Sequence, residues 1–165
     1  TLFEAHLAAH PFLFGARPAS SDFAAYGQLT QLTHFDPTPM ALSLEVAPRV
    51  FAWVDVIDDL SGLEPQETGW IDAKSLPPTL TALLAEMART YVPVMLANAR
   101  AAAAGKPMVE TEVEGLAWSQ QTFPYQVKCV QWLRQSFAAL GDDAQATVRA
   151  VLSESGCLPL IEAAI

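Results

Sequence analysis

The stretch PFLFGARPASSDFAAYGQLTQLTHF, residues 11–35, decides the fold of this chain. An apolar run and a glycine precede the Arg17-Pro18 step, after which a helix is predicted from about Asp22 to His34. Its inward face is almost uncharged, which is typical of a helix at the centre of a fold. Asp22 falls in the first turn, where a carboxylate accepts hydrogen bonds from unpaired backbone N–H groups. We therefore expect Asp22 to act as a structural cap.

Gly27 lies inside this predicted helix, where glycine costs about 1 kcal/mol relative to alanine. Close packing against a neighbouring helix usually offsets such a cost. We therefore expect another helix to approach Gly27, and other helices to surround the central one on all sides.

The residues before the helix resemble a known family, the C-terminal helical domain of glutathione S-transferases. That family has an apolar residue, Gly, Arg-Pro or similar, and then a Ser/Thr-x-x-Asp capping box, and Phe14-Gly15-Ala16-Arg17-Pro18 with Asp22-Phe23 follows this pattern. Ala19 stands where the family has its capping hydroxyl, so Ser20 or Ser21 would supply the cap in a shifted register.

A second matching element is Ala47-Pro48-Arg49-Val50 with Trp53, which resembles the family's next helix, started by proline and carrying an inward Trp. That helix is predicted from about Pro48 to Leu60. The resemblance covers roughly residues 1–60, and residues 61–165 carry no motif of the family.

Composition favours one domain with a large apolar surface. The chain has 165 residues, of which 52% are hydrophobic and 16% charged, and its mean hydropathy is +0.23. Part of that surface is therefore expected to meet a partner or another domain. The net charge of −9, with basic residues scattered along the chain, disfavours nucleic-acid binding. Glu86 and Arg89 interrupt the most apolar window, so no membrane span is expected. Cys129 and Cys157 fit small core residues in a reducing cytoplasm.

The rest of the chain is predicted to be mostly helical. Residues 61–76 form an irregular connection from which Trp70 packs back onto the core, and a long helix runs from Pro77-Pro78 to near Gly105. Further helices are predicted from about 124 to 140 and from 142 to 153, the last with Asp142 as its N-cap.

Between these helices, Met108 to Gln120 alternates as a strand does, with Glu114-Gly115 as the turn of a two-stranded ribbon. The predicted fold class is therefore all-α, a glutathione S-transferase C-terminal-like bundle with a small β-ribbon inserted in its C-terminal part. Residues 1–165 are predicted to form a single helical domain.

Several polar residues are candidates for a metal site or for catalysis, and each also has a structural interpretation. His6 and His10 stand four apart but lack the zinc-protease pattern, so two exposed histidines are expected. His34 with Asp36 fits a base and its orienter, or helix capping. A solvated strand face accounts for Glu110, Glu112 and Glu114 without a cation. No metal site and no catalytic residue is predicted.

The aromatic residues Trp118, Phe123 and Tyr125 gather where the ribbon meets the next helix. They would line a pocket for an apolar substrate, or they would tie the ribbon to the helices. Both interpretations stay open.

The family resemblance implies a division of labour. An N-terminal thioredoxin-like domain, expected to be missing ahead of Thr1, would hold glutathione and activate its thiol. This chain would supply the hydrophobic electrophile wall, through Trp118, Phe123 and Tyr125, and an interdomain or homodimer surface, with no cofactor of its own. The alternative is a non-catalytic protein-interaction module of the same fold.

Overall fold

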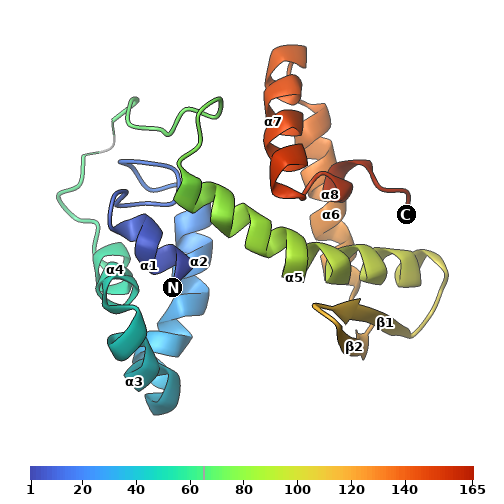
Figure 1. The fold of residues 1–165 in the computed structure, drawn as a ribbon, viewed down its shortest axis with the longest axis horizontal. Coiled ribbons are helices and arrows are strands. Elements are labelled where there is room, and N and C mark those ends of the chain that lie inside the picture. The colour runs from blue at the N-terminus through green and yellow to red at the C-terminus, as the bar shows by residue number, and fades with distance from the viewer. Residues whose placement is uncertain (65) are drawn as a thin grey trace. The chain divides into compact units, whose positions relative to one another are not determined.

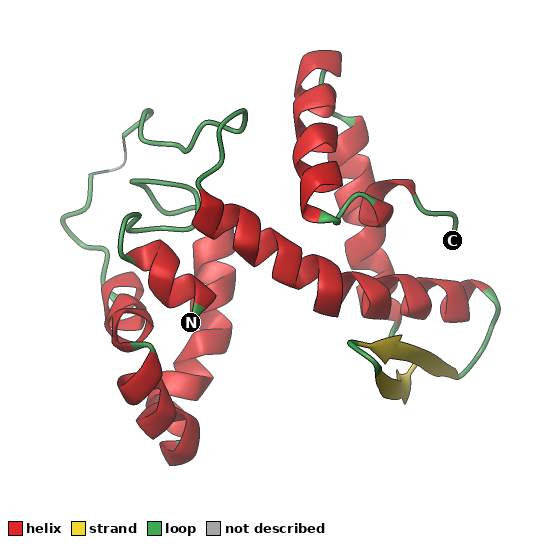
Figure 2. Cartoon of the chain, viewed as in Figure 1, coloured by secondary structure: helices red, strands yellow, loops and turns green. Residues whose placement is uncertain are grey.

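The computed structural model describes residues 1–64 and 66–165, which fall into two compact units within residues 1–80 and 81–165. Helices dominate, and the strands form one two-stranded antiparallel sheet (Figure 2). The predicted all-α fold class with a small β-ribbon is therefore confirmed. That the whole chain acts as a single domain stays a prediction.

The first unit is a small helical assembly around one tryptophan. Its helices are α1 (Leu2–Leu7), α2 (Ser20–Thr30), the π-helix η1 (Gln31–Phe35), α3 (Pro37–Val46) and α4 (Pro48–Asp58) (Figure 1). Helix α4 contacts α1, α2 and α3. Trp53 on α4 is buried with Phe12, Val54 and Ile57, and its indole Nε1–H donates to the Pro11 carbonyl at 3.0 Å. The predicted inward Trp is confirmed.

The predicted central helix exists, but other helices do not surround it. It runs as α2 continued by η1, and one flank stays open: Phe23 is 50% exposed and Phe35 is 71% exposed. A Cβ added at Gly27 would meet no described atom within 4 Å. The expectation of a helix packed against Gly27 is therefore wrong among the described residues, because α4 covers the other side of α2.

The sequence Asp36-Pro37-Thr38-Pro39 is typical of a break between helices, since proline cannot continue the hydrogen-bond ladder, yet helix α3 begins within it. The break is only one residue long. The Asp36 carboxylate accepts the Thr38 N–H at 3.0 Å, and Pro37 occupies the first helical position, so a new helix begins at once. This helix has no buried residue, and it exposes Leu42, Leu44 and Val46.

The connection after α4 pairs its backbone with the residues before α2. The Ala16 N–H donates to the Gly69 carbonyl at 2.7 Å, and the Ile71 N–H donates to the Phe14 carbonyl at 2.8 Å. Gly15 sits between them with φ 129°, and a Cβ there would lie 2.1 Å from the Gly69 carbonyl oxygen. Glycine is thus required at this position by both its backbone conformation and the space available.

The irregular character of this connection is confirmed for the described residues; residue 65 lies outside them. Trp70 was expected to pack onto the core, and that expectation is wrong. Its side chain is 48% exposed, and the guanidinium carbon of Arg17 lies 4.7 Å from its ring centroid. Backbone pairing, not indole burial, holds this segment.

The second unit contains the whole ribbon and most of the long helix. Its elements are α5 (Pro78–Ala103, whose first residues belong to the first unit), β1 (Met108–Val113), β2 (Leu116–Gln121), α6 (Pro124–Ala138), α7 (Asp142–Ser155) and α8 (Pro159–Glu162). The core consists of Val92, Met95, Leu96, Val130, Cys157 and Leu160. Met87 and Tyr91 on α5 are partly exposed.

Among the described residues, one helix, α5, is long and apolar enough to cross a membrane. A single helix of this kind is weak evidence for a membrane span, because core helices of soluble proteins share that length and hydropathy. Of its apolar window, 22% is buried within the chain.

The ribbon follows its predicted turn. Val113 pairs with Leu116 across Glu114-Gly115, and both turn residues have positive φ, 51° and 79°, as a type I′ turn requires. Val109 anchors the ribbon, being almost fully buried. The predicted ribbon is confirmed.

The start of α7 differs from the expectation. Gly141 is the N-cap residue, and Asp142 is the first helical residue and makes no side-chain cap. The Gln145 side chain donates to the Leu140 carbonyl at 2.9 Å, so it bonds the end of the preceding helix. Gly156 ends α7 in a left-handed conformation with φ 80°.

Candidate functional site

Asp22 holds the N-terminus of α2 from the buried interior. Its side chain is fully buried, with Oδ2 accepting the Ala19 N–H and Oδ1 accepting the Leu13 N–H, each at 2.8 Å. The first bond is the carboxylate half of a capping box, and Ala19 at the N-cap supplies no hydroxyl half. The Ser21 hydroxyl is buried without a partner, so it does not replace the missing half. Asp22 thus fixes both the helix and the turn before it.

His6 is a buried member of the same unit and not one of two exposed histidines. Its side chain is fully buried; Nδ1 lies 2.9 Å from the Thr79 hydroxyl and Nε2 lies 3.2 Å from the Phe12 carbonyl. Burial lowers the pKa of His6 below its ordinary value. The His10 ring stacks on it at 4.9 Å between centroids.

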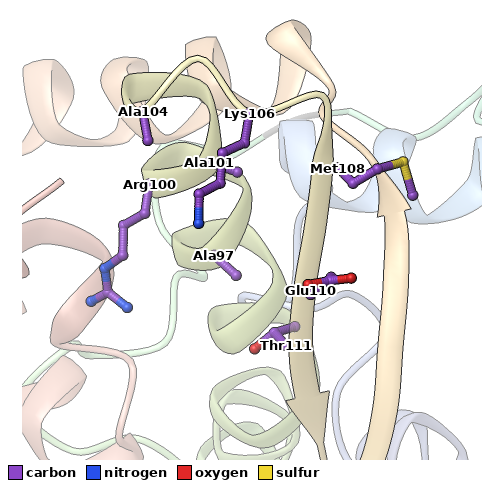
Figure 3. A pocket seen from close by; sticks show the side chains of 8 residues that line it. All are labelled: Ala97, Arg100, Ala101, Ala104, Lys106, Met108, Glu110 and Thr111. Carbon is purple, nitrogen blue, oxygen red and sulfur yellow. The ribbon is translucent and has the colours of Figure 1, made fainter.

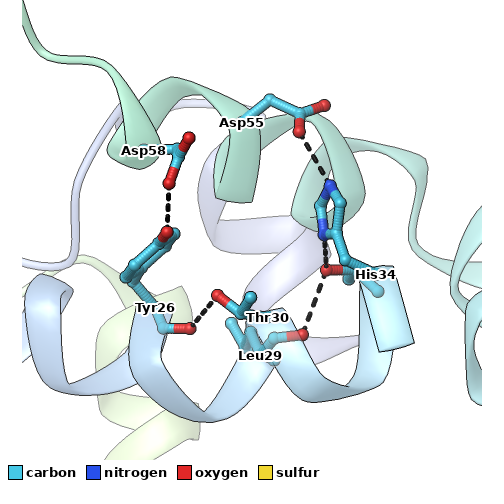
Figure 4. A network of polar contacts seen from close by, with 7 residues as sticks. Tyr26, Leu29, Thr30, His34, Asp55 and Asp58 are labelled. Atoms are coloured by element: carbon cyan, nitrogen blue, oxygen red, sulfur yellow. Dashed lines mark hydrogen bonds and ion pairs between the residues drawn. The ribbon is translucent and has the colours of Figure 1, made fainter. Parts of the chain in front are cut away.

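A polar network joins α2 and η1 to α4 around a pocket of about 250 Å3 (Figure 4). The Tyr26 hydroxyl donates to the Asp58 carboxylate. His34 places Nε2 2.9 Å from Asp55 Oδ1 and Nδ1 2.6 Å from the hydroxyl of Thr33. Of the two interpretations of His34 with Asp36, the base and its orienter does not occur, since His34 pairs with Asp55, whereas Asp36 does cap a helix, α3.

This network has little capacity for acid–base chemistry. Both ring nitrogens of His34 already have protein partners, so neither is open to a substrate. The hydrogen bond to Asp58 is the largest cause that raises the pKa of Tyr26 above its ordinary value. A phenol held in this way keeps its proton at neutral pH and does not favour a neighbouring thiolate. The network's evident role is to connect the helices.

In the second unit, an open apolar groove of about 460 Å3 lies between α5 and the ribbon. Tyr91 and Val94 line it from α5, while Val113 and Trp118 line it from the two strands. Burial raises the pKa of the Tyr91 hydroxyl. Trp118, which sequence analysis assigned to a substrate wall, is 45% exposed here. The surface of the groove is partly aromatic and almost entirely apolar.

Phe123 and Tyr125 lie at the start of α6, outside the residues that line this groove. Their ring centroids are 6.4 Å apart, and Tyr125 meets Trp132 edge to face at 5.8 Å. Both side chains are more than half exposed. The structure therefore places the three predicted residues in two neighbouring sets and does not gather them around one pocket.

Residues 1–55 match the family model described as glutathione S-transferase, C-terminal domain. Residues 1–55 form a glutathione S-transferase C-terminal-like segment. The resemblance inferred from Phe14–Pro18, Asp22 and Trp53 is thereby confirmed, over one third of the chain (55 of 165 residues). Searches of curated proteins and of solved structures found no match.

Within this glutathione S-transferase-like segment, sequence analysis missed the aspartate that pairs with His34. A signal was available: Tyr26, Thr30 and His34 recur every four residues, which puts three polar groups on one face of a helix. Asp55 and Asp58, three apart on α4, form the matching face. Only the packing of the two helices shows that these faces meet.

The described residues contain no group of three or more His, Cys, Asp or Glu side chains arranged to hold a metal ion. Of the three acidic residues singled out on the ribbon, Glu114 occupies the turn and pairs with Arg89 at 2.7 Å. Glu110 and Glu112 are exposed on β1.

Proposed function

We propose that this chain is the C-terminal helical part of a cytoplasmic glutathione-S-transferase-like protein and contributes an apolar wall for an electrophilic substrate. A separate thioredoxin-like domain would bind glutathione and activate its thiol. The observation that carries the proposal is the apolar groove beside Trp118, together with the family match of residues 1–55. The occupied polar groups of His34 and Tyr26 are consistent with thiol activation elsewhere.

Tryptophan fluorescence tests the wall directly. An apolar aryl halide is expected to quench the emission of the chain saturably, and Trp118→Phe is expected to remove the saturable part. Trp132→Phe is the matched control, because Trp132 is 50% exposed on α6 and does not line the groove. Equal losses in the two variants would contradict the proposal, as would quenching without saturation.

The whole protein's activity requires a second measurement. Conjugation of glutathione to the same aryl halide by the full-length polypeptide would support the transferase role. Glutathione binding by residues 1–165 alone would contradict the placement of the thiol site in another domain.

A second candidate, a protein-interaction module, is favoured by α3. Its Leu42, Leu44 and Val46 side chains are all more than 40% exposed, which is a poor arrangement for an isolated helix in water. Sedimentation velocity over a concentration series would detect a homodimer formed through these exposed side chains. Leu42→Ser with Leu44→Ser should then give a monomer, whereas Leu63→Ser, at an exposed loop position, should not. A wild-type monomer at every concentration would exclude the homodimer.

A further inference from the structure

A pocket of about 410 Å3 lies between the last turns of α5 and the beginning of β1, wholly within the second unit (Figure 3). Small side chains form the α5 side, namely Ala97, Ala101 and Ala104. Arg100 and Lys106 bring two positive charges to its lining, and Glu110 brings one negative charge. The pocket differs from the Trp118 groove in being mainly polar.

Arg100 has no ion pair or side-chain hydrogen bond within the described part of the chain. Every other arginine has one: the partners are Gln66 for Arg17, Glu4 for Arg49, Glu86 and Glu114 for Arg89, Leu160 and Ala163 for Arg134, and Glu162 for Arg149. In a chain with a net charge of −9, an unpaired guanidinium at a pocket is unusual. Lys106 adds a second cation, an ammonium, without a partner among the same residues.

The end of α5 does not need these two cations as caps. The Lys106 N–H donates to the Ala101 carbonyl at 2.9 Å, and the Gly105 N–H donates to the Ala102 carbonyl at 3.0 Å. With Gly105 at φ 65°, this is a Schellman motif, which satisfies the helix end with backbone alone. The side chains of Arg100 and Lys106 are thus left available to a ligand.

Lys106 is held in place through its backbone. Its carbonyl accepts the Thr122 hydroxyl at 2.6 Å, and the neighbouring Pro107 carbonyl accepts the Thr122 N–H at 2.9 Å. Val109, three residues after Lys106, is almost fully buried and fixes β1. The ammonium therefore extends from an anchored position, which lowers the ordering cost of binding.

We propose that this pocket binds a small organic dicarboxylate. Arg100 would receive one carboxylate in the bidentate geometry that guanidinium groups favour, and Lys106 would receive the other as a point charge. Glu110 repels any anion in the pocket, so both cations are needed to offset its charge. The site is independent of the apolar wall proposed above.

Calorimetric titration of the 165-residue chain with glutarate at constant ionic strength tests the site. Saturable binding is expected, and Arg100→Gln and Lys106→Gln are each expected to weaken it about tenfold, through loss of one charge-assisted contact. The control is the double variant Lys74→Gln with Lys128→Gln, which removes two positive charges, one more than either pocket variant, at exposed positions outside the pocket. It should retain affinity within about twofold.

Inorganic phosphate separates the dicarboxylate from other anions. It should bind more weakly than glutarate to the wild-type chain, because its compact charge cannot meet Arg100 and Lys106 separately, as two carboxylates can. Phosphate binding as tight as glutarate binding would overturn the ligand class. Absence of saturable glutarate binding, or equal weakening in the Lys74/Lys128 control, would overturn the site. Circular dichroism of each variant confirms that the helices remain folded.

Discussion

Replacing Asp22 by alanine should destabilise the first unit more than any other single capping change in it. The carboxylate is fully buried and accepts two backbone N–H groups, those of Leu13 and Ala19, at 2.8 Å each. Alanine leaves both part-buried donors without their acceptor. The turn before α2 and the first turn of the helix would lose their common anchor.

The magnitude follows from these two bonds. A hydrogen bond to a charged group contributes about 1.5–3 kcal/mol, so two contribute about 3–6 kcal/mol. Removing the carboxylate also ends the cost of burying it, which places the expected loss near the lower end, about 3 kcal/mol. Small proteins are stable by about 5–15 kcal/mol, so the loss is a large share of the total. Asp22→Asn keeps one acceptor oxygen and should lose about half as much.

Urea unfolding followed by circular dichroism measures this loss, and amide hydrogen exchange at Leu13 and Ala19 locates it. Asp36→Ala is the matched control, because Asp36 also caps a helix but is exposed; it should cost about 1 kcal/mol. The reasoning is refuted if the two alanine variants are equally stable, or if the Leu13 amide exchanges as slowly in Asp22→Ala as in the wild type.

Three further predictions follow from the same structure. Gly27→Ala should stabilise the chain by up to about 1 kcal/mol in urea unfolding, because the added Cβ meets open space; a destabilised variant would show that something packs there. The lowered pKa of His6 means that the unfolded chain binds more protons in acid, so stability should fall as the pH drops below about 6.5, and less steeply in His6→Gln, as urea midpoints against pH would show. Cys129 should react with a thiol reagent before Cys157, whose thiol is buried and has a raised pKa; equal rates in the native protein would contradict this.

The features that could be predicted from the sequence are those set by residues close together in the chain. The Glu114-Gly115 turn follows from two residues that tolerate positive φ between alternating strands. The start of α4 follows from Pro48, and the end of α7 follows from Gly156. Asp22 belongs to the same class, since its Ala19 bond spans three residues.

Long-range partners were beyond such reasoning. Nothing near His6 in the sequence indicates that Thr79 will bond it 73 residues later, so an exposed histidine was the natural expectation. His34 likewise finds Asp55 across two helices, although Asp36 is closer in the chain. In both cases tertiary packing determines the partner, and the neighbouring sequence does not indicate which residue that is.

The open flank of α2 connects these observations to the proposed function. Phe23 and Gly27 lie four residues apart on one face, and the helix there bears both the conformational cost of glycine and an exposed aromatic ring. Burying one phenylalanine is worth about 1.5–3 kcal/mol, which exceeds the glycine cost of about 1 kcal/mol. A surface of this composition is unfavourable alone and favourable when covered closely, since glycine lets a neighbouring backbone approach. Under the proposed function, the interdomain or dimer surface would provide that cover, and Gly27→Ala would then stabilise the isolated chain while weakening its association with the partner.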